Sequence, residues 1–346
     1  MDEASEQAQL SDEVNVPIQA IQIIDPEVVA RLPPGTNAVR IEAHGASFWT
    51  RTARLETERD GVKGAVFLKT TYGERGRDLL SSEYHCMGKL HAAAPDPYLV
   101  PRPIAWGSYS SIPDVHFFLS EFRPMTGGLP DLGIFPAKIA AMHRGTSTSK
   151  CPPDSGRFGF DATTFHGEIP IEHGWSDTWE EYFARTTRAL LRLEQEARGP
   201  SEEVRQLTEP FFEKVVPRLL RPLHTGGRSI RPSLIHGDLW HGNASTDRDT
   251  GMPVIFDAAS FYAHNEYELA VWRQPWNEIN KPYRERYHEH FPKSPPEADY
   301  DDRGLLYATR VNILDSILYR KDPSYREMLL AGMRELVEKF PDGLEE

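Results

Sequence analysis

The sequence predicts an α+β protein of two lobes, with a small, β-rich N-terminal lobe and a larger, mainly helical C-terminal lobe. The chain of 346 residues is longer than one average domain. Segments with the alternating pattern of strands gather between residues 38 and 71, whereas helical periodicity dominates after residue 135. We therefore expect a mobile N-terminal segment over residues 1–24, an N-lobe over 25–122 and a C-lobe over 123–346.

The acidic composition narrows the class of partner. The formal net charge is −13 at pH 7, which argues against nucleic acid or an anionic membrane as the main partner. The two cysteines, Cys86 and Cys151, lie far apart in the sequence and suit a reducing compartment. No apolar run approaches the length of a membrane span, and the first residues are acidic. We therefore expect a soluble, cytoplasmic protein that is a monomer or weak dimer.

Local signals place the elements of the N-lobe. Asp25-Pro26 is typical of a helix start, and Pro33-Pro34-Gly35 ends that helix. Asp60-Gly61 predicts a tight hairpin turn between two strands, and the apolar spacing over residues 76–90 predicts a helix. The expected strands cover residues 38–42, 51–57, 65–71 and 115–122.

The C-lobe shows longer helical patterns and two short apolar runs. Asp177, with Glu180 three residues later, forms a capping-box pattern before an aromatic-rich helix. The runs 233–235 and 253–256 are expected to flank a loop as a hairpin, which would place Asp257 at the far end. Further helices are expected over residues 135–144, 305–318 and 325–340, the last two amphipathic.

The stretch from Leu234 to Ala270 carries the chemistry. Asp238 and Asn243 lie five positions apart, and Asp257 follows the second apolar run. Protein-kinase-like enzymes use this order for phosphoryl transfer, in which one Asp accepts the hydroxyl proton while the Asn and the second Asp hold Mg²⁺. Oxygen ligands suit this hard cation. The predicted architecture is therefore a bilobal protein-kinase-like fold.

Two other interpretations of this stretch stay open. Isolated Asp residues often occupy turns, although an ordered set around a strand is much less often a coincidence. His236, Asp238 and His241 also match a ligand cluster for metal-dependent hydrolysis. A transition-metal site would require further His or Cys ligands, and none is suitably spaced in the sequence.

The N-lobe supplies candidates for the phosphates of a nucleotide. Lys69 lies on a strand and Glu83 near the middle of the next helix, the positions of the ion pair that anchors phosphates in kinase-like folds. An exposed helical Glu83 is the alternative. The small residues Gly45, Ala46 and Ser47 let backbone amides approach phosphate, although such a loop is also common as a plain turn.

The segment after the strand at 115–122 is the expected hinge between the lobes. This strand ends in polar residues, and a glycine-containing linker follows. Adenine would form hydrogen bonds with backbone atoms around Glu121 and Arg123. The identity of these side chains therefore gives little information about nucleotide binding.

Two segments of the sequence resemble a known protein family. HGDLWHGN, followed by VIFDAASFYAHNEYELA, is similar to the fructosamine kinase (ketosamine-3-kinase) family, and most of all to its fungal members. The resemblance covers most of residues 25–340. It implies a protein-kinase-like fold and ATP-dependent phosphorylation of the 3-hydroxyl of a ketosamine, ribulosamine or fructosamine, on glycated protein lysines or on small molecules. The phosphorylated adduct is then unstable and leaves, so the family is regarded as deglycating.

The resemblance also implies roles for single residues. Asp238 matches the catalytic base, Asn243 and Asp257 the Mg²⁺ ligands, and Lys69 and Glu83 the pair that anchors ATP. A glutamate near Glu266 or Glu268 in such folds fixes a distant arginine, so we expect a structural role there.

Substrate contacts are expected next to the base. Trp240 matches the family motif and is expected to pack on the sugar, with buried packing as the alternative. His241 stands where many members have Ser and bears on substrate choice. Ala258 stands where many members have Pro and would loosen the metal loop.

Two competing functions share this motif set. A kinase for a free small molecule, such as an aminoglycoside or choline, would use the same catalytic residues. A non-catalytic scaffold is the other competitor, but a decayed site usually loses one of the required side chains, and this chain retains them all.

Overall fold

A computed structural model of the chain describes residues 15–45, 49–148 and 156–344. The chain folds into two compact units. Unit 1 comprises residues 1–127 and 246–257, and unit 2 comprises residues 128–245 and 258–346.

Residues 246–257 belong to unit 1, whereas the predicted boundary placed them in the C-lobe. A backbone hydrogen bond holds this segment there, because the Ile255 amide donates to the Leu99 carbonyl over 2.8 Å. The segment ends at Asp257, so the second predicted metal ligand belongs to unit 1, whereas Asp238 belongs to unit 2.

The core of unit 1 is a five-stranded antiparallel sheet in the order β1-β2-β3-β5-β4. Asp60 and Gly61 join β2 to β3, and both adopt positive φ, as the predicted two-residue hairpin requires. The strands are β1 (Thr36–Ala43), β2 (Arg51–Arg59), β3 (Val62–Tyr72), β4 (Pro103–Ser108) and β5 (Val115–Glu121).

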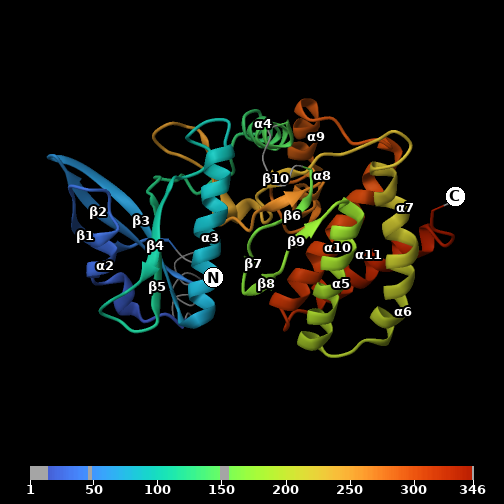
Figure 1. Cartoon of the computed structure of the whole chain (residues 1–346), viewed down its shortest axis with the longest axis horizontal. Helices are drawn as coiled ribbons and strands as arrows, with labels where there is room; N and C mark the ends of the chain where they lie inside the picture. The colour runs from blue at the N-terminus through green and yellow to red at the C-terminus, as the bar shows by residue number, and fades with distance from the viewer. Residues whose placement is uncertain (1–14, 46–48, 149–155, 345–346) are drawn as a thin grey trace. The chain divides into compact units, whose positions relative to one another are not determined.

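Helix α3 (Gly73–Ala93) packs against this sheet and lies beside β4 and β5 (Figure 1). Its buried apolar residues recur at the three- and four-residue spacing of a helix, from Leu80 to Met87 and Leu90. The helix predicted over residues 76–90 is thus confirmed and is longer at both ends.

The predicted mobile segment is wrong over residues 15–24. The short 3-10 helix η1 (Ile18–Ile21) and Val16 contribute to the apolar core of unit 1. Asp25 then caps α2 (Pro26–Ala30) as predicted, its carboxylate accepting the amide of Glu27. Residues 1–14 lie outside the described part of the chain.

Unit 2 contains a small sheet in the order β10-β13-β6-β9. The predicted hairpin of 233–235 with 253–256 is wrong. β10 pairs with β13, whereas β12 (Pro253–Ile255) pairs with β11 (Ala244–Thr246), the strand next to it in the chain. The four strands of the sheet are β6 (Phe158–Phe160), β9 (Gly174–Ser176), β10 (Ser233–Ile235) and β13 (Phe261–Ala263).

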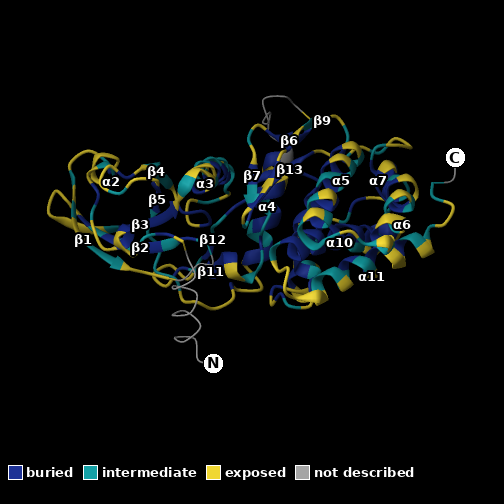
Figure 2. Ribbon diagram, turned by 90° about the horizontal axis from the view of Figure 1, so that it is seen from below, coloured by how far each residue is buried: buried dark blue, intermediate teal, exposed yellow. Residues whose placement is uncertain are grey.

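Helices make up most of unit 2. The helix α10 packs against α5 and α11 and is buried along most of its length, as Figure 2 shows. It is therefore not the one-sided amphipathic helix that was predicted. The helices are α4 (Phe135–Thr148), α5 (Trp179–Arg198), α6 (Glu202–Pro210), α7 (Val216–Leu220), α8 (Asn265–Glu268), α9 (Lys281–His290), α10 (Tyr300–Leu318) and α11 (Pro323–Lys339), with η2 (Phe211–Val215), a π-helix, and the 3-10 turns η3 (Arg221–Leu223), η5 (Val271–Arg273) and η6 (Glu297–Asp299).

The cap of α5 lies one residue later than predicted. The Thr178 hydroxyl accepts the amide of Glu181, so Thr178 is the N-cap. Asp177 instead forms an ion pair with Arg157, at 3.2 Å.

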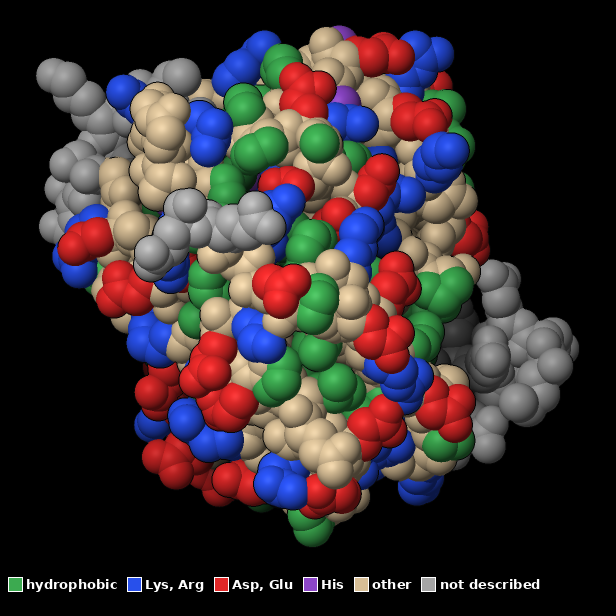
Figure 3. Space-filling view, turned by 90° about the vertical axis from the view of Figure 1, so that its right-hand side faces the viewer, with side chains coloured by type: hydrophobic (Ala, Val, Ile, Leu, Met, Phe, Trp, Pro, Cys, Tyr) green, Lys and Arg blue, Asp and Glu red, His purple; other side chains and the backbone are tan. Residues whose placement is uncertain are grey.

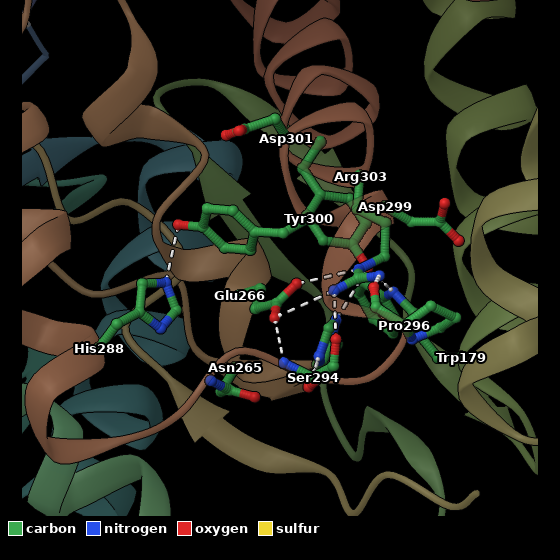
Figure 4. A network of polar contacts seen from close by, with 12 residues as sticks. Trp179, Asn265, Glu266, His288, Ser294, Pro296, Asp299, Tyr300, Asp301 and Arg303 are labelled. Atoms are coloured by element: carbon green, nitrogen blue, oxygen red, sulfur yellow. Dashed lines mark hydrogen bonds and ion pairs between the residues drawn. The ribbon is translucent and has the colours of Figure 1, made fainter.

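A buried ion pair ties α8 to α10. Arg303 Nε lies 3.0 Å from Glu266 Oε2, and the same guanidinium donates to the carbonyls of Ser294 and Pro296 (Figure 4). The prediction that a glutamate here fixes a distant arginine is confirmed. Because every polar group of the pair finds a partner, its desolvation is compensated.

The surface carries both signs of charge. On the face in Figure 3, acidic and basic side chains of the described residues are interspersed. None of the helices in the described ranges has the length and apolar character needed to cross a membrane.

Candidate active site

Three side chains of unit 1 form a charged cluster. Lys69, on β3, places its Nζ 2.8 Å from Glu83 Oε2 and 2.9 Å from Asp257 Oδ1. The lysine and Glu83 side chains are only 6% and 7% exposed, whereas that of Asp257 is 39% exposed. The predicted ion pair between Lys69 and Glu83 is present, and Asp257 joins it.

This cluster keeps Lys69 charged. Burial opposes the positive charge, but the carboxylates of Asp257 and Glu83 outweigh burial and raise the pKa of the lysine. Asp257 has a φ of 60°, a left-handed conformation that Asp tolerates better than most residues. A partly exposed carboxylate held by a permanent cation is a suitable oxygen donor for a hard metal ion.

In unit 2, the loop after β10 is fixed by Glu268 of α8. The Glu268 carboxylate accepts the amides of His236 at 2.5 Å and Gly237 at 3.0 Å. Gly237 has a φ of 85°, and a Cβ atom there would lie 2.3 Å from the Ala259 carbonyl oxygen, so only glycine fits. The loop therefore presents Asp238 in one defined position.

Asp238 is held by Asn243. The Asn243 side chain, at the end of the 3-10 turn η4 (His241–Asn243), donates from Nδ2 to Asp238 Oδ2 over 3.1 Å and to its carbonyl over 2.8 Å. Both donors of the amide are thus directed at Asp238. The amide oxygen lies outside these bonds, and it is the atom that Mg²⁺ would coordinate.

A histidine that the sequence did not single out lies beside the other carboxylate oxygen. His166 Nδ1 is 3.6 Å from Asp238 Oδ1. The histidine ends β7 (Thr164–His166), which pairs with β8 (Ile169–Ile171) in a small hairpin. Its side chain is largely buried, so its position is defined by the surrounding packing.

A small hollow opens next to Asp238 in unit 2. Its walls combine polar groups of the loop after β10 with apolar side chains from α10. The lining residues are His166, Gly237, Asp238, Tyr267, Glu268, Val271, Val311 and Leu314.

Both side-chain clusters lie within a region that matches a known family. The model of the family "Fructosamine kinase" matches residues 45–315. The chain belongs to the fructosamine kinase family. This match contains the lysine, the glutamate, both aspartates and the asparagine described above.

Two relatives of the family illustrate the similarity. A ketosamine-3-kinase of Mus musculus is 36% identical over 151 residues, 44% of this chain and 45% of the relative. A chloroplastic protein-ribulosamine 3-kinase of Arabidopsis thaliana is 30% identical over 199 residues, 55% of this chain and 53% of the relative. The matched segments thus span about half the length of these curated relatives.

A solved structure shows the shared fold. The putative fructosamine-3-kinase of Thermobifida fusca YX-ER1 has a TM-score of 0.68 and 21% identity, and the match covers 88% of this chain and 95% of that one. The predicted α+β, protein-kinase-like fold is therefore confirmed.

Trp240 and His241, the two predicted substrate residues, contact other residues of unit 2. The half-buried Trp240 ring rests on Gly242, where a Cβ atom would lie 2.3 Å from the indole, and it meets Trp276 edge to face at 6.1 Å. His241 Nδ1 lies 3.0 Å from Asn277 Oδ1. These contacts give Trp240 packing partners and hold His241 in place, and contact with a sugar stays a prediction for both residues.

The nucleotide loop and hinge are described in part. Ala46 and Ser47 lie outside the described residues, and Gly45 adopts a positive φ of 80°. At the hinge, the Glu121 amide donates to the Arg102 carbonyl, and its carboxylate accepts from Arg123 over 2.9 Å. Adenine contacts at the hinge thus stay a prediction that concerns backbone atoms other than the Glu121 amide.

His236 and His241, the two histidines of the metal-hydrolase interpretation, each contact another protein group through Nδ1. Among the residues that the structure describes, no three His, Cys, Asp or Glu side chains are grouped as a metal site. His236 is buried, and its Nδ1 faces the amide of Asp238 at 3.3 Å. It orders the loop instead.

Proposed function

We propose that the chain is an ATP-dependent kinase that phosphorylates the 3-hydroxyl of ketosamines, ribulosamine or fructosamine. The observation that carries this proposal is the pair of clusters, Lys69 with Glu83 and Asp257 in unit 1 and Asp238 with Asn243 in unit 2. Phosphoryl transfer requires these groups and little else from the protein. The names of the relatives support the ketosamine as acceptor.

The first cluster would serve the nucleotide. ATP supplies the phosphoryl group, and Mg²⁺ neutralises its charge. Lys69, kept charged and oriented by Glu83, binds phosphate oxygens. The carboxylate of Asp257 and the amide oxygen of Asn243 are the donors that would hold Mg²⁺.

The second cluster would serve the acceptor. Asp238 orients the substrate hydroxyl and accepts its proton as the oxygen forms its bond to the γ-phosphorus and the bond to ADP breaks. Asn243 and His166, on opposite oxygens of the carboxylate, keep it aimed. Trp240 and His241 lie next to this base in the sequence and are the proposed neighbours of the sugar.

The biological substrate would be a ketosamine on a glycated protein lysine or a free small molecule. Phosphorylation at the 3-position creates an unstable adduct, so the reaction would lead to deglycation. We also propose a cytoplasmic location and a monomeric or weakly dimeric state, which the two cysteines and the net charge of −13 support.

Mass spectrometry tests the proposal. The full chain is incubated with Mg·ATP and a ribosylated or glucosylated lysine peptide, with choline and an aminoglycoside as competing acceptors. We expect one added phosphate on the sugar of the peptide and none on the competitors. Phosphate on a competitor, or on no acceptor, would overturn the proposed substrate.

A further inference from the structure

Helix α10 carries two buried polar atoms without hydrogen-bond partners. The Asn312 and Asp315 side chains belong to residues that are 7% and 4% exposed. Asn312 Oδ1 and Asp315 Oδ2 have no partner among the described residues. Buried polar groups are normally paired, because an unpaired one loses the bonds that it made with water. Asn312 Oδ1 is an acceptor, and so is Asp315 Oδ2 when the carboxyl is ionised, so a ligand with N–H donors would pair both atoms.

Asp315 lies beside the part of α10 that lines the hollow at Asp238, and Asn312 comes three residues before it on the same side of the helix. Val311 and Leu314 line the hollow beside Asp238. Asp315 comes four residues after Val311 and next to Leu314, and residues three or four apart share one face of a helix. Burial raises the pKa of Asp315, and the negative charge of Asp238 adds to this effect, so that the pKa is about 8.

An aromatic pair completes the surroundings of Asp315. Tyr319 follows it by four residues and stacks on Tyr325 of α11, with ring centroids 5.1 Å apart and an interplanar angle of 28°. Tyr319 is 40% exposed. Burial and then the Asp315 charge raise the pKa of both tyrosines. A carboxylate beside aromatic rings is a combination that binds organic cations.

We propose that Asp315, Asn312 and Tyr319 form a subsite for the protonated amine of the substrate. This inference rests on the proposed function and deepens it, because it assigns recognition of the ketosamine nitrogen. That nitrogen is four covalent bonds from the 3-hydroxyl oxygen, a span of about 5 Å at ordinary bond lengths. A substrate whose hydroxyl meets Asp238 therefore carries its ammonium group next to the base. Its N–H groups supply the donors that Asn312 and Asp315 lack.

The charge of the subsite decides the class of ligand. The raised pKa keeps Asp315 protonated near neutral pH, and a bound ammonium group would lower that pKa and favour the carboxylate. With Asp315 ionised, the two carboxylates of Asp315 and Asp238 repel an anionic acceptor and favour a cationic one. A neutral amide in place of the amine would offer no charge to Asp315. The subsite thus distinguishes ketosamines from uncharged sugars that carry the same hydroxyl.

Steady-state kinetics with two substrates test this subsite. One is a fructosyl-lysine peptide, whose linking amine is charged, and the other is the same peptide with that nitrogen acetylated and neutral. Asp315→Asn is expected to raise KM for the amine peptide by roughly 10- to 100-fold, the size of a lost charge-assisted hydrogen bond. KM for the acetylated peptide should stay the same. An equal change for both peptides, or no change for either, would overturn the proposal.

Controls separate the subsite from folding and from the proposed function. Glu338→Gln removes an exposed carboxylate from α11 and should change neither KM. If Asp315→Asn does not fold, Tyr319→Leu should give the same amine-selective rise. If the wild-type chain phosphorylates neither peptide, the proposed function fails, and thermal-shift binding of the two peptides then tests the subsite alone. A shift with the amine peptide that Asp315→Asn abolishes supports it, and equal shifts with both peptides, or no shift, overturn it.

Discussion

His166 Nδ1 lies 3.6 Å from Asp238 Oδ1, while Asp238 Oδ2 accepts a hydrogen bond from Asn243. The carboxylate of the proposed base is therefore flanked on both oxygens. A base acts efficiently only when its oxygen is aimed at the proton that it takes. We therefore propose that His166, which belongs to the β7–β8 hairpin, positions this carboxylate.

Replacement of His166 tests this positioning role. We expect His166→Asn to lower kcat by roughly 10- to 100-fold, because a slightly misplaced catalytic group costs that much. The KM for ATP should change little, since His166 contacts the base and belongs to unit 2. The exposed His290 provides a matched control, as His290→Asn should leave kcat unchanged. An unaltered kcat in His166→Asn would show that Asn243 alone suffices.

The buried pair of Lys69 and Glu83 predicts a defect in nucleotide binding. Glu83→Gln removes the charge that orients Lys69, so we expect KM for Mg·ATP to rise by roughly 10-fold or more. Lys69→Met should have a similar effect, and the double variant should be no worse than either single one, because both act through one contact. Glu74→Gln, on the exposed first turn of α3, is the control. Additive effects in the double variant would argue against a shared role.

The ion pair between Glu266 and Arg303 predicts a loss of stability. Arg303→Met leaves the Glu266 carboxylate buried without its partner, which is expected to lower the free energy of unfolding by about 3–5 kcal/mol. Urea unfolding measures this change. Arg286, whose pair with Glu289 is half exposed, is the comparison, and Arg286→Met should cost at most about 1 kcal/mol. Equal costs at the two sites would mean that burial of the pair is unimportant.

Asp315 predicts a dependence of stability on pH. Burial, with the Asp238 charge adding to it, raises the pKa of Asp315 from 3.8 to about 8 in the folded chain. The folded state therefore keeps a proton that the unfolded state releases, so this contribution to stability is complete below about pH 4 and is lost as the pH rises toward 8. Asp315→Asn stays neutral throughout and should stabilise the chain by a few kcal/mol, as an order of magnitude, at high pH.

Thermal unfolding of both proteins at pH 5, 7 and 9 measures this difference. The advantage of Asp315→Asn should grow with pH and level off above pH 8. A constant difference across the three pH values would contradict the shifted titration of Asp315. A variant that is more stable yet binds the amine substrate more weakly would identify Asp315 as a group kept for binding.

Much of the scaffold follows from local signals in the sequence. Asp60-Gly61 specifies its hairpin because both residues tolerate positive φ, and Asp25 caps its helix through its own side chain. The Lys69–Glu83 pair follows from the positions of a strand and the next helix. In each case the deciding residues lie close together in the chain.

The features that were missed depend on partners far away in the chain. His166 belongs to the β7–β8 hairpin, which follows β6 in the chain, and β6 pairs with the distant strand β13. Its contact with Asp238 joins residues that lie far apart in the sequence. The partner of β10 was misassigned because the short strand β11, which takes up β12, carries no strong strand pattern. The all-round burial of α10 needs α5 and α11 on its flanks, which periodicity along one helix does not reveal.

Removal of the Asp238 carboxylate is the most direct test of the proposed chemistry. Single-turnover transfer of phosphate from Mg·ATP to a ribosylated lysine peptide is measured for the wild type, for Asp238→Asn and for Asp249→Asn, which removes an exposed carboxylate. We predict that Asp238→Asn transfers phosphate roughly 100- to 10,000-fold more slowly, the usual contribution of a general base, while ATP affinity and the Asp249→Asn rate stay at wild-type values. Transfer by Asp238→Asn at the wild-type rate would contradict the assignment of Asp238 as the base.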